Sequence, residues 1–291
     1  MTIQEAYKQI SYQLYSIYDD REASGIADML TEHVTGFGKM DRLLNKDMIL
    51  SETQEDRLMQ MTYELMQHKP VQYVLQEAWF MGIKFYVDAQ VLIPRPETEE
   101  LVEWIVERQK TNSKTEVNNQ VKILDIATGS GCIAIALQKK LTGAITEASD
   151  ISAAALEVAK KNAAGVNMVI DFKKADILNE SSWKNFGEYD IIVSNPPYIK
   201  KTEAAEMRLN VLQYEPAIAL FVPDDDALIF YKAIGRFAKQ HLIPGGNLFM
   251  EINEAHAEEL IWLFCEMDFE NVTVKKDMQG KDRMICASKR E

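Results

Sequence analysis

Residues 121–137 read VKILDIATGSGCIAIAL, and this stretch sets the fold expected for the whole chain. The apolar run Val121–Ala127 has the length of a buried strand, and the apolar residues that follow Gly131 predict a helix over 131–141. Gly129 and Gly131 let the backbone turn tightly and approach a ligand. A strand that leads at once into a helix predicts a parallel sheet.

The chain after residue 121 repeats this alternation of strand and helix. The pattern predicts an α/β fold with a doubly wound, mostly parallel sheet of seven strands, in which a closing hairpin makes one strand antiparallel. Binding sites in such sheets lie beyond the carboxyl ends of the strands. The predicted strands cover 121–127, 144–150, 168–175, 189–194, 247–252, 271–276 and 284–288, and the predicted helices cover 131–141, 152–164, 227–241 and 254–267.

The beginning of the chain predicts a separate small helical domain. Three stretches carry apolar residues at helical spacing, and the last begins with the capping box Ser51-Glu52-Thr53-Gln54. That stretch ends before Pro70, which cannot continue a helix. The predicted helices cover 2–18, 22–33 and 51–68.

A hairpin and a linker helix are predicted between the two domains. Val71–Leu75 and the alternating stretch 79–87, with Gly82 near the turn, are typical of a short hairpin. Residues 111–120 are polar and aperiodic, which predicts a loop. Three regions are therefore predicted. The helical domain covers 1–75, the hairpin and linker helix cover 76–110, and the sheet domain covers 111–291.

The composition argues against several classes of protein. The net charge is −13, and the first 90 residues carry 14 acidic and 8 basic residues, so tight binding of nucleic acid is not expected. No apolar run approaches the roughly 18 residues of a membrane span, and the start of the chain does not resemble a signal peptide. Three scattered cysteines and four scattered histidines predict neither disulfides nor a metal site. The expected setting is the reducing cytoplasm.

Acidic residues end the second and third predicted strands, at Asp150 and Asp176, and Asp125 lies within the first; together they suit a cofactor site. Asp150 could accept the hydroxyls of a ribose, and Asp176 could border an adenine. Two cofactors fit this layout, because Gly129–Ala134 also matches a dinucleotide fingerprint with alanine at its third small position. S-adenosylmethionine lacks a pyrophosphate and carries an ammonium group that Asp125 could hold. Asp125 favours it, since the strand of a dinucleotide site is usually apolar at that point.

A proline pair follows the fourth predicted strand, in Ser194-Asn195-Pro196-Pro197-Tyr198. The prolines could merely end the strand. They also offer no N–H and restrict the backbone, which would hold the Pro196 carbonyl rigidly beside the side-chain carbonyl of Asn195. Two fixed acceptors suit the two hydrogens of a planar –NH2 group, and Tyr198 offers a flat wall. The expected chemistry is in-line displacement at a sulfonium methyl, with the acceptors stabilising positive charge on nitrogen.

These motifs resemble those of known methyltransferases. Asp125–Gly131 and Asn195–Tyr198 resemble the class I S-adenosylmethionine-dependent enzymes that act on planar nitrogen. Leu92–Glu99 and Tyr214–Leu220 resemble blocks of the protein-glutamine N5-methyltransferases that modify peptide-chain release factors. The resemblance covers nearly the whole chain. It implies a seven-stranded class I sheet, S-adenosylmethionine as methyl donor, S-adenosylhomocysteine as product, and the glutamine of a release-factor Gly-Gly-Gln loop as substrate, recognised by the helical domain.

The resemblance also implies a role for individual residues. This sequence departs from the family pattern at two positions. Ala127 stands where glycine is common, a change expected to be tolerated, and Gln213 stands where arginine is common. Arg95 and Glu97 either wall the methionine end of the cofactor or brace the linker through a salt bridge. The implied substrate residues are Asn195, Pro196, Pro197 and Tyr198, of which Asn195, Pro196 and Tyr198 are catalytic, and the implied cofactor residues are Asp125, Ala127, Thr128, Gly129, Ser130, Gly131, Asp150, Asp176, Ile177 and Asn195.

Other functions stay open on the sequence alone. The substrate could be a glutamine of a ribosomal protein, or residues 195–198 could bind the amino group of a flipped-out nucleic-acid base. The acidic N-terminal domain argues against the nucleic acid. A nicotinamide-dependent oxidoreductase would explain the glycine turn but would give 195–198 no role, and a binding module without catalysis would leave every motif unused. The expected partners are release factors, without stable nucleic-acid or membrane binding.

Overall fold

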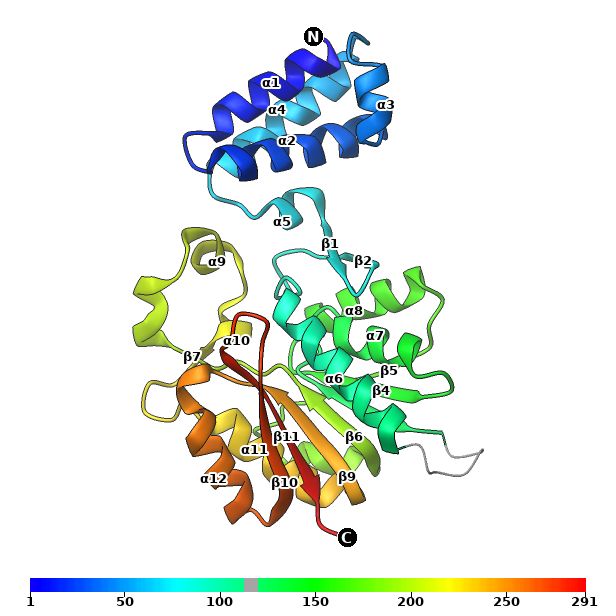
Figure 1. Ribbon diagram of the computed structural model, residues 1–291, viewed down its shortest axis with the longest axis vertical. Helices are drawn as coiled ribbons and strands as arrows, with labels where there is room; N and C mark the ends of the chain where they lie inside the picture. Colours follow the sequence, from blue (N-terminus) through cyan, green and yellow to red (C-terminus); the bar gives the residue numbers. More distant parts are fainter. Residues whose placement is uncertain (113–119) are drawn as a thin grey trace. The chain divides into compact units, whose positions relative to one another are not determined.

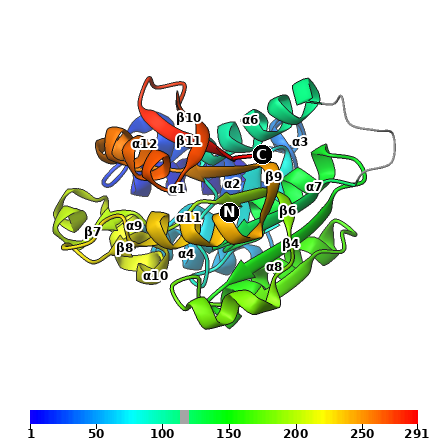
Figure 2. The same cartoon turned by 90° about the horizontal axis from the view of Figure 1, so that it is seen from below.

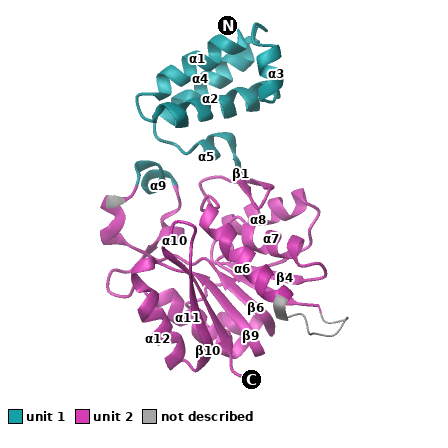
Figure 3. Cartoon of the chain, viewed as in Figure 1, with its two compact units in different colours: residues 1–77, 208–214 teal, residues 78–207, 215–291 magenta. Residues whose placement is uncertain are grey.

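The computed structural model describes residues 1–112 and 120–291, which form two compact units (Figures 1 and 3). Unit 1 comprises Met1–Glu77 together with the later segment Arg208–Tyr214. Unit 2 comprises Ala78–Met207 and Glu215–Glu291. Most of the loop predicted over 111–120 lies outside the described residues.

Unit 1 is built from helices around an apolar core of its own. Its largest helices are α1 (Ile3–Leu14), α2 (Asp20–Thr35) and α4 (Glu52–Met66), as predicted. The capping box at the start of α4 is confirmed, because the Ser51 hydroxyl accepts from the Gln54 N–H while the Gln54 side chain accepts from the Ser51 N–H. Short helices α3 (Lys39–Leu44), α5 (Val71–Leu75) and α9 (Leu209–Tyr214) complete the unit.

The predicted hairpin is confirmed, except at its first segment. Its strands are β1 (Glu77–Phe80) and β2 (Ile83–Tyr86), joined by a turn at Gly82. The extension of this hairpin pattern to Val71–Leu75 was wrong, because that segment is helix α5. Pro70 fixes a backbone suited to starting a helix, and its carbonyl accepts from the N–H groups three and four residues later. Five residues are too few to separate a helical period from an alternating one.

The seven-stranded sheet of unit 2 confirms the predicted fold class. Its strand order is β10-β11-β9-β6-β3-β4-β5, and β11 alone among these strands runs antiparallel to both of its neighbours. The strands are β3 (Lys122–Ile126), β4 (Ile145–Asp150), β5 (Asp171–Lys174), β6 (Tyr189–Ser194), β9 (Leu242–Glu251), β10 (Phe269–Lys276) and β11 (Asp282–Lys289).

Helices cover both faces of this sheet and bury a separate core on each (Figures 1 and 2). Adjacent residues of a strand point to opposite faces, so Ile191 lies in one core and Ile192 in the other. One layer contains α6 (Pro96–Asn112), α7 (Cys132–Lys140) and α8 (Ala153–Gly165), and the other contains α11 (Ile229–His241) and α12 (Ala257–Glu266).

A small parallel strand pair lies outside the main sheet and was not predicted. It joins β7 (Ile199–Lys200), directly after Tyr198, to β8 (Phe221–Val222), which follows helix α10 (Ala217–Leu220). The pairing therefore holds the end of the Asn195–Tyr198 motif next to the end of the Tyr214–Leu220 block. Three short 3-10 turns complete the unit, at Glu180–Asn185, Lys201–Glu206 and Glu254–His256.

Candidate active site

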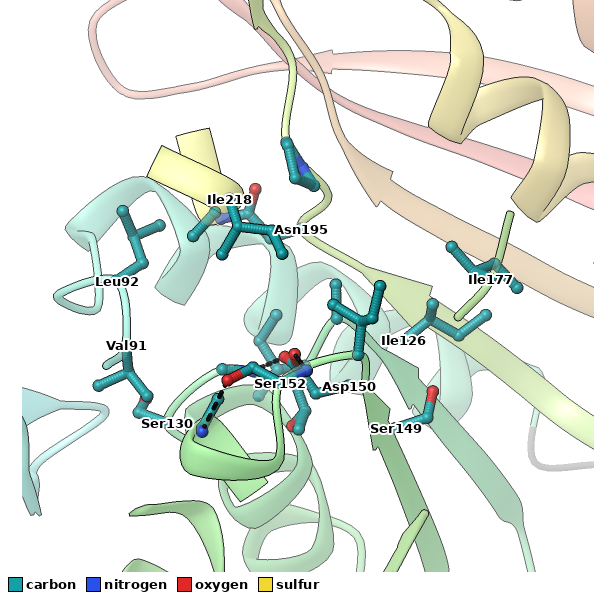
Figure 4. A pocket seen from close by; sticks show the side chains of 18 of the residues that line it. Val91, Leu92, Ile126, Ser130, Ser149, Asp150, Ser152, Ile177, Asn195 and Ile218 are labelled. Atoms are coloured by element: carbon teal, nitrogen blue, oxygen red, sulfur yellow. Dashed lines mark hydrogen bonds between the residues drawn. The ribbon is translucent and has the colours of Figure 1, made fainter. Parts of the chain in front are cut away.

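A cavity of about 320 Å³ opens at the carboxyl ends of strands β3, β4, β5 and β6 (Figure 4). This is the edge at which ligands bind in open α/β sheets, and the volume lies within the range of small-molecule sites. The predicted site residues that line it are Ala127, Thr128, Gly129, Ser130, Asp150, Asp176, Ile177, Asn195 and Pro197. Asp125, Gly131, Pro196 and Tyr198 are not among its lining residues.

The glycine-rich turn between β3 and α7 is held by the acid that ends the next strand. One carboxylate oxygen of Asp150 accepts from the Gly129 N–H at 2.9 Å, and the other accepts from the Ser152 N–H at 2.9 Å. Burial raises the pKa of this carboxyl above its ordinary value. A polar acceptor is thus fixed at one wall of the cavity, beside Ser149 and Ile151.

Three residues of the turn have left-handed backbone conformations. Ala127 has a φ of +59°, Gly129 of +53° and Gly131 of +80°. A side chain disfavours this conformation, which explains in physical terms why glycine would suit position 127. At Gly131 a Cβ atom would also lie 3.1 Å from the Cβ of Ala159, so the turn and α8 pack directly on each other.

Asp125 lies beneath the turn, fully buried, rather than on the cavity wall. One of its oxygens accepts from the Thr128 hydroxyl at 2.6 Å and from the Ala134 N–H at 3.2 Å, and its other oxygen has no hydrogen-bond partner. Burial raises the pKa of this carboxyl to about 7. The residue therefore braces the turn and brings a group that titrates near neutral pH close to the cavity.

Three N–H groups in and after the turn are engaged within the protein, which disfavours a pyrophosphate. A dinucleotide site uses free N–H groups at the start of the helix to bind phosphate oxygens. Here the N–H groups of Gly129, Gly131 and Ala134 donate to Asp150, to the Thr128 carbonyl and to Asp125, respectively. Two carboxylates at the start of α7 favour a cationic ligand instead.

The far wall of the cavity combines one acid with apolar side chains. Asp176 and Ile177 follow β5, and Phe230 contributes an aromatic ring from α11. The carboxylate of Asp176 accepts from the Leu178 N–H at 2.9 Å, which fixes this loop.

Burial raises the pKa of the lining thiol Cys132 to about 12, so it stays protonated and does not act as a nucleophile.

Asn195 lies at the rim of the same cavity, near Ile218 of α10 (Figure 4). Its side-chain Nδ2 donates to the Thr98 hydroxyl at 3.2 Å. Tyr198 lies outside the cavity, and its hydroxyl donates to the Glu251 carboxylate at 3.0 Å. Burial, and then the charge of Glu251, raises the pKa of Tyr198 well above its usual value, so the hydroxyl remains a donor.

Arg95 also lines the cavity, and it pairs with a buried carboxylate. Its Nη2 lies 2.6 Å from Oε1 of Glu215, whose side chain is 1% exposed. The other oxygen of Glu215 accepts from the Ile93 N–H at 3.2 Å. Glu97 does not line the cavity and accepts a hydrogen bond from Gln279 at 3.4 Å.

Three polar residues of the site were not predicted from the sequence: Thr98, Glu215 and Glu251. Thr98 and Glu215 lie inside the blocks that carried the resemblance, but no spacing rule connects residues that far apart. Glu251 ends β9, just as Asp150 ends β4. An acid at the end of a buried strand was therefore a signal that could have identified it.

Within the described residues, no group of three or more histidine, cysteine, aspartate or glutamate side chains could hold a metal ion. The same part of the chain contains no helix that is both long enough and apolar enough to cross a bilayer.

Comparison with known proteins gives matches over both units. Two family models match, the Methyltransferase small domain over residues 110–214 and the PrmC N-terminal domain over residues 5–75. The release factor glutamine methyltransferase of Flavobacterium psychrophilum is 42% identical over 98% of each chain. The enzyme of the same name from Bacteroides thetaiotaomicron is 40% identical over 96% of this chain and 98% of its own.

A solved structure is similar in fold. The human methyltransferase 10 domain containing protein superposes with a TM-score of 0.51 and 19% identity, over 72% of this chain and 90% of that chain. At that identity the likeness supports the architecture of the sheet.

Proposed function

Because this chain belongs to the release factor glutamine methyltransferase family, we propose that it methylates a glutamine side chain of a peptide chain release factor. The proposed acceptor atom is N5 of the glutamine in the Gly-Gly-Gln motif, and the proposed methyl donor is S-adenosylmethionine. The helices of residues 1–75 are proposed to recognise the release factor, and the three free cysteines accord with a cytoplasmic setting.

The single observation that carries this proposal is the position of Asn195. It lines the same cavity as Asp150 and Asp176. An amide that can accept from an –NH2 group therefore shares one cavity with the acids that suit a nucleoside. This is the arrangement that transfer between a nucleoside-bearing donor and a nitrogen acceptor needs.

The residues of the cavity fit the proposed donor. Asp150 is fixed by two backbone N–H groups and is suited to accept ribose hydroxyls. Ile177 and Phe230 offer apolar surface to an adenine, next to Asp176. When bound, S-adenosylmethionine supplies an electrophilic methyl group on a sulfonium centre. The buried carboxyl of Asp125 favours a nearby positive charge, which this donor carries on its ammonium and sulfonium groups, whereas a dinucleotide would bring a negatively charged pyrophosphate to the turn.

Asn195 and Pro196 are proposed to orient the nitrogen of the glutamine amide. An amide nitrogen is a poor nucleophile because its lone pair is delocalised. The side-chain oxygen of Asn195 and the carbonyl of Pro196 would each accept one hydrogen of the –NH2 group, which turns the nitrogen towards the methyl group and stabilises its developing positive charge. The proton can leave after the methyl group has moved, so no strong base is required.

A labelling experiment tests the proposal. We expect transfer of label from methyl-labelled S-adenosylmethionine to a purified release factor, and no transfer when the glutamine of its Gly-Gly-Gln motif is replaced by asparagine. Labelling of a ribosomal-protein glutamine, or of naked RNA or DNA, in place of the release factor would contradict it. Calorimetric titration with S-adenosylmethionine and with NAD separately tests the choice of cofactor.

A further inference from the structure

A hydrogen-bond relay at the cavity wall joins Asn195, through Thr98, to a buried carboxylate. The Asn195 Nδ2 donates to the Thr98 hydroxyl at 3.2 Å, and that hydroxyl donates to Oε2 of Glu251 at 2.6 Å. The second oxygen of Glu251 accepts from the Tyr198 hydroxyl at 3.0 Å. Thr98 and Glu251 are each 2% exposed, so water does not compete for these bonds. The relay therefore connects both polar side chains of the Asn195–Tyr198 motif through one carboxylate.

The relay has a direction, which the chemistry of a hydroxyl imposes. A threonine hydroxyl has one hydrogen, and a carboxylate can only accept. Thr98 therefore gives its hydrogen to Glu251 and can offer only a lone pair to Asn195. A short donor–acceptor distance of 2.6 Å is typical of a hydrogen bond to a charged acceptor.

This direction decides which end of the Asn195 amide is left free. The –NH2 end and the oxygen end of an asparagine have almost the same shape, so the partners of the group must select between them. Since the Thr98 hydroxyl can only accept a hydrogen bond from Asn195, the –NH2 end of Asn195 faces Thr98. Its oxygen is then left without this partner and is available to accept from another molecule.

We propose that Thr98 and Glu251 are positioning residues that fix the Asn195 amide with its oxygen towards the substrate –NH2 group. The proposal rests on the proposed function. Both residues act through Asn195, although Thr98 also lines the cavity. Glu251 at the same time holds Tyr198, so a single carboxylate at the end of β9 sets the geometry of both side chains. The reverse orientation of the Asn195 amide would present a second –NH2 group to the substrate and would repel it.

Burial and the neighbouring groups act in opposite directions on the pKa of Glu251, and burial, the larger effect, raises it above the ordinary value. The hydrogen bonds from Thr98 and Tyr198 and the positive charge of Arg283 lower it. Glu97 is the acid whose charge opposes ionisation of Glu251. The two hydroxyl donors and Arg283 thus favour the charged, acceptor-only form on which the direction of the relay depends.

Three variants of Thr98 and Glu251 test the relay. Thr98→Val removes the acceptor for Asn195 at nearly constant volume, and Thr98→Ser is the matched control because it keeps the hydroxyl. We expect Thr98→Val to lower kcat for release-factor methylation by roughly tenfold or more, less than the roughly 10²-fold expected for Asn195→Ala. The Kd for S-adenosylmethionine, measured by calorimetry, should stay within about threefold of the wild-type value, and Thr98→Ser should keep most of kcat.

Glu251→Gln tests the direction itself, because a glutamine amide can both donate and accept. It should lower kcat by several-fold in the wild-type background and by a smaller factor in Thr98→Val, where the link to Asn195 is already broken and only the contact with Tyr198 remains to be perturbed. Three results would overturn the relay: an unchanged kcat in Thr98→Val, equal losses in Thr98→Ser and Thr98→Val, or effects of Thr98→Val and Glu251→Gln that multiply. The wild-type protein separates the two proposals, because absence of release-factor methylation by wild type would refute the function rather than the relay.

Discussion

The guanidinium of Arg95 lies 2.6 Å from the carboxylate of Glu215, although 120 residues separate them in the sequence. The pair joins the two blocks, Leu92–Glu99 and Tyr214–Leu220, whose sequences resemble those of the protein-glutamine N5-methyltransferases. Glu215 is buried and also accepts from the Ile93 N–H, so it holds the extended segment that lines one side of the cavity. Arg95 thus forms a salt bridge and also lines the cavity, while its place at the methionine end of a cofactor stays a prediction.

Removal of this pair should weaken cofactor binding. Glu215→Ala leaves the Ile93 N–H without its acceptor and Arg95 without its partner, so we expect the Kd for S-adenosylmethionine to rise by roughly tenfold. In a double-mutant cycle with Arg95→Ala, the coupling energy should be about 1 kcal/mol, because Arg95 is 32% exposed and solvent weakens the pair. Calorimetric Kd values for wild type, the two single variants and the double variant give this coupling energy. Strictly additive changes in binding free energy would show that the contact carries no coupling.

A glycine at position 127 should stabilise the protein. Ala127 has a φ of +59°, where alanine is strained and glycine is not. Part of the gain is offset because glycine has more freedom in the unfolded chain, so we expect Ala127→Gly to add about 0.5–1 kcal/mol. Thermal unfolding should show a Tm higher by about 2 °C. Ala134→Gly, in helix α7, is the control and should lower Tm; a lower Tm for both variants would contradict the strain.

Substitution of Gly131 should be far more harmful than substitution of a glycine with the same backbone. Gly131→Ala adds a Cβ atom 3.1 Å from the Cβ of Ala159, in addition to backbone strain at a φ of +80°. Gly143 has a φ of +84° but no atom within 4 Å of the added Cβ, so Gly143→Ala isolates the strain. We expect Gly131→Ala to cost about 1–3 kcal/mol more than Gly143→Ala, measured by urea unfolding. Equal losses would show that α8 moves away freely.

Binding of a cationic donor should release protons from the protein near pH 7. Burial raises the pKa of Asp125 to about 7, so a substantial fraction of this carboxyl is protonated at that pH. A nearby positive charge favours the ionised form and lowers the pKa. We therefore expect release of up to about half a proton when S-adenosylmethionine binds at pH 7, and less at pH 9. Calorimetry in buffers of different ionisation enthalpy measures this release, which Asp125→Asn should abolish.

The carboxyl of Asp125 also makes the stability of the folded protein depend on pH. Its pKa is raised in the folded protein, so the folded state binds more protons than the unfolded chain between about pH 4 and pH 7. The stabilisation is complete below pH 4 and is lost as the pH rises through 7. The free energy of unfolding of wild type and of Asp125→Asn should be measured at pH 5 and at pH 8. Relative to wild type, the variant should be more stable at pH 8 than at pH 5.

Two substitutions should separate cofactor binding from turnover. Asn195→Ala should keep the Kd for S-adenosylmethionine and lower turnover by roughly 10²-fold, because one acceptor for the amide nitrogen is lost. Asp150→Ala should mainly raise that Kd, since the carboxylate lies on the cavity wall and also holds the Gly129 N–H. Near-normal turnover in Asn195→Ala would count against its role as an acceptor.

Much of the fold could be predicted because its signals are local. The alternation of strand and helix specifies the sheet, and the end of β6 at Ser194 followed directly from the prolines after it. Val71–Leu75 could not be assigned correctly, since five residues do not define a period. The early start of β9 at Leu242 was also missed, because Pro244 and two glycines resemble a turn.

The candidate site was predictable to the extent that it lies at strand ends. Asp150 and Asn195 were found in this way. The contacts of Thr98 with Glu251 and of Arg95 with Glu215 join residues more than 100 positions apart, and no local pattern specifies them. Asp125 was predicted near the cofactor, but only the structure shows that it lies beneath the turn and not on the cavity wall.

The membership of helix α9 in unit 1 has a consequence for how such enzymes can recombine. Arg208–Tyr214 is encoded in the middle of the gene region for unit 2, and the Tyr214 hydroxyl donates to the Gln67 carbonyl at 2.6 Å. A crossover near residue 77 would therefore transfer an incomplete module. Exchange of the whole unit between homologous genes needs a second, matched replacement of seven codons, so the two segments are expected to be inherited together.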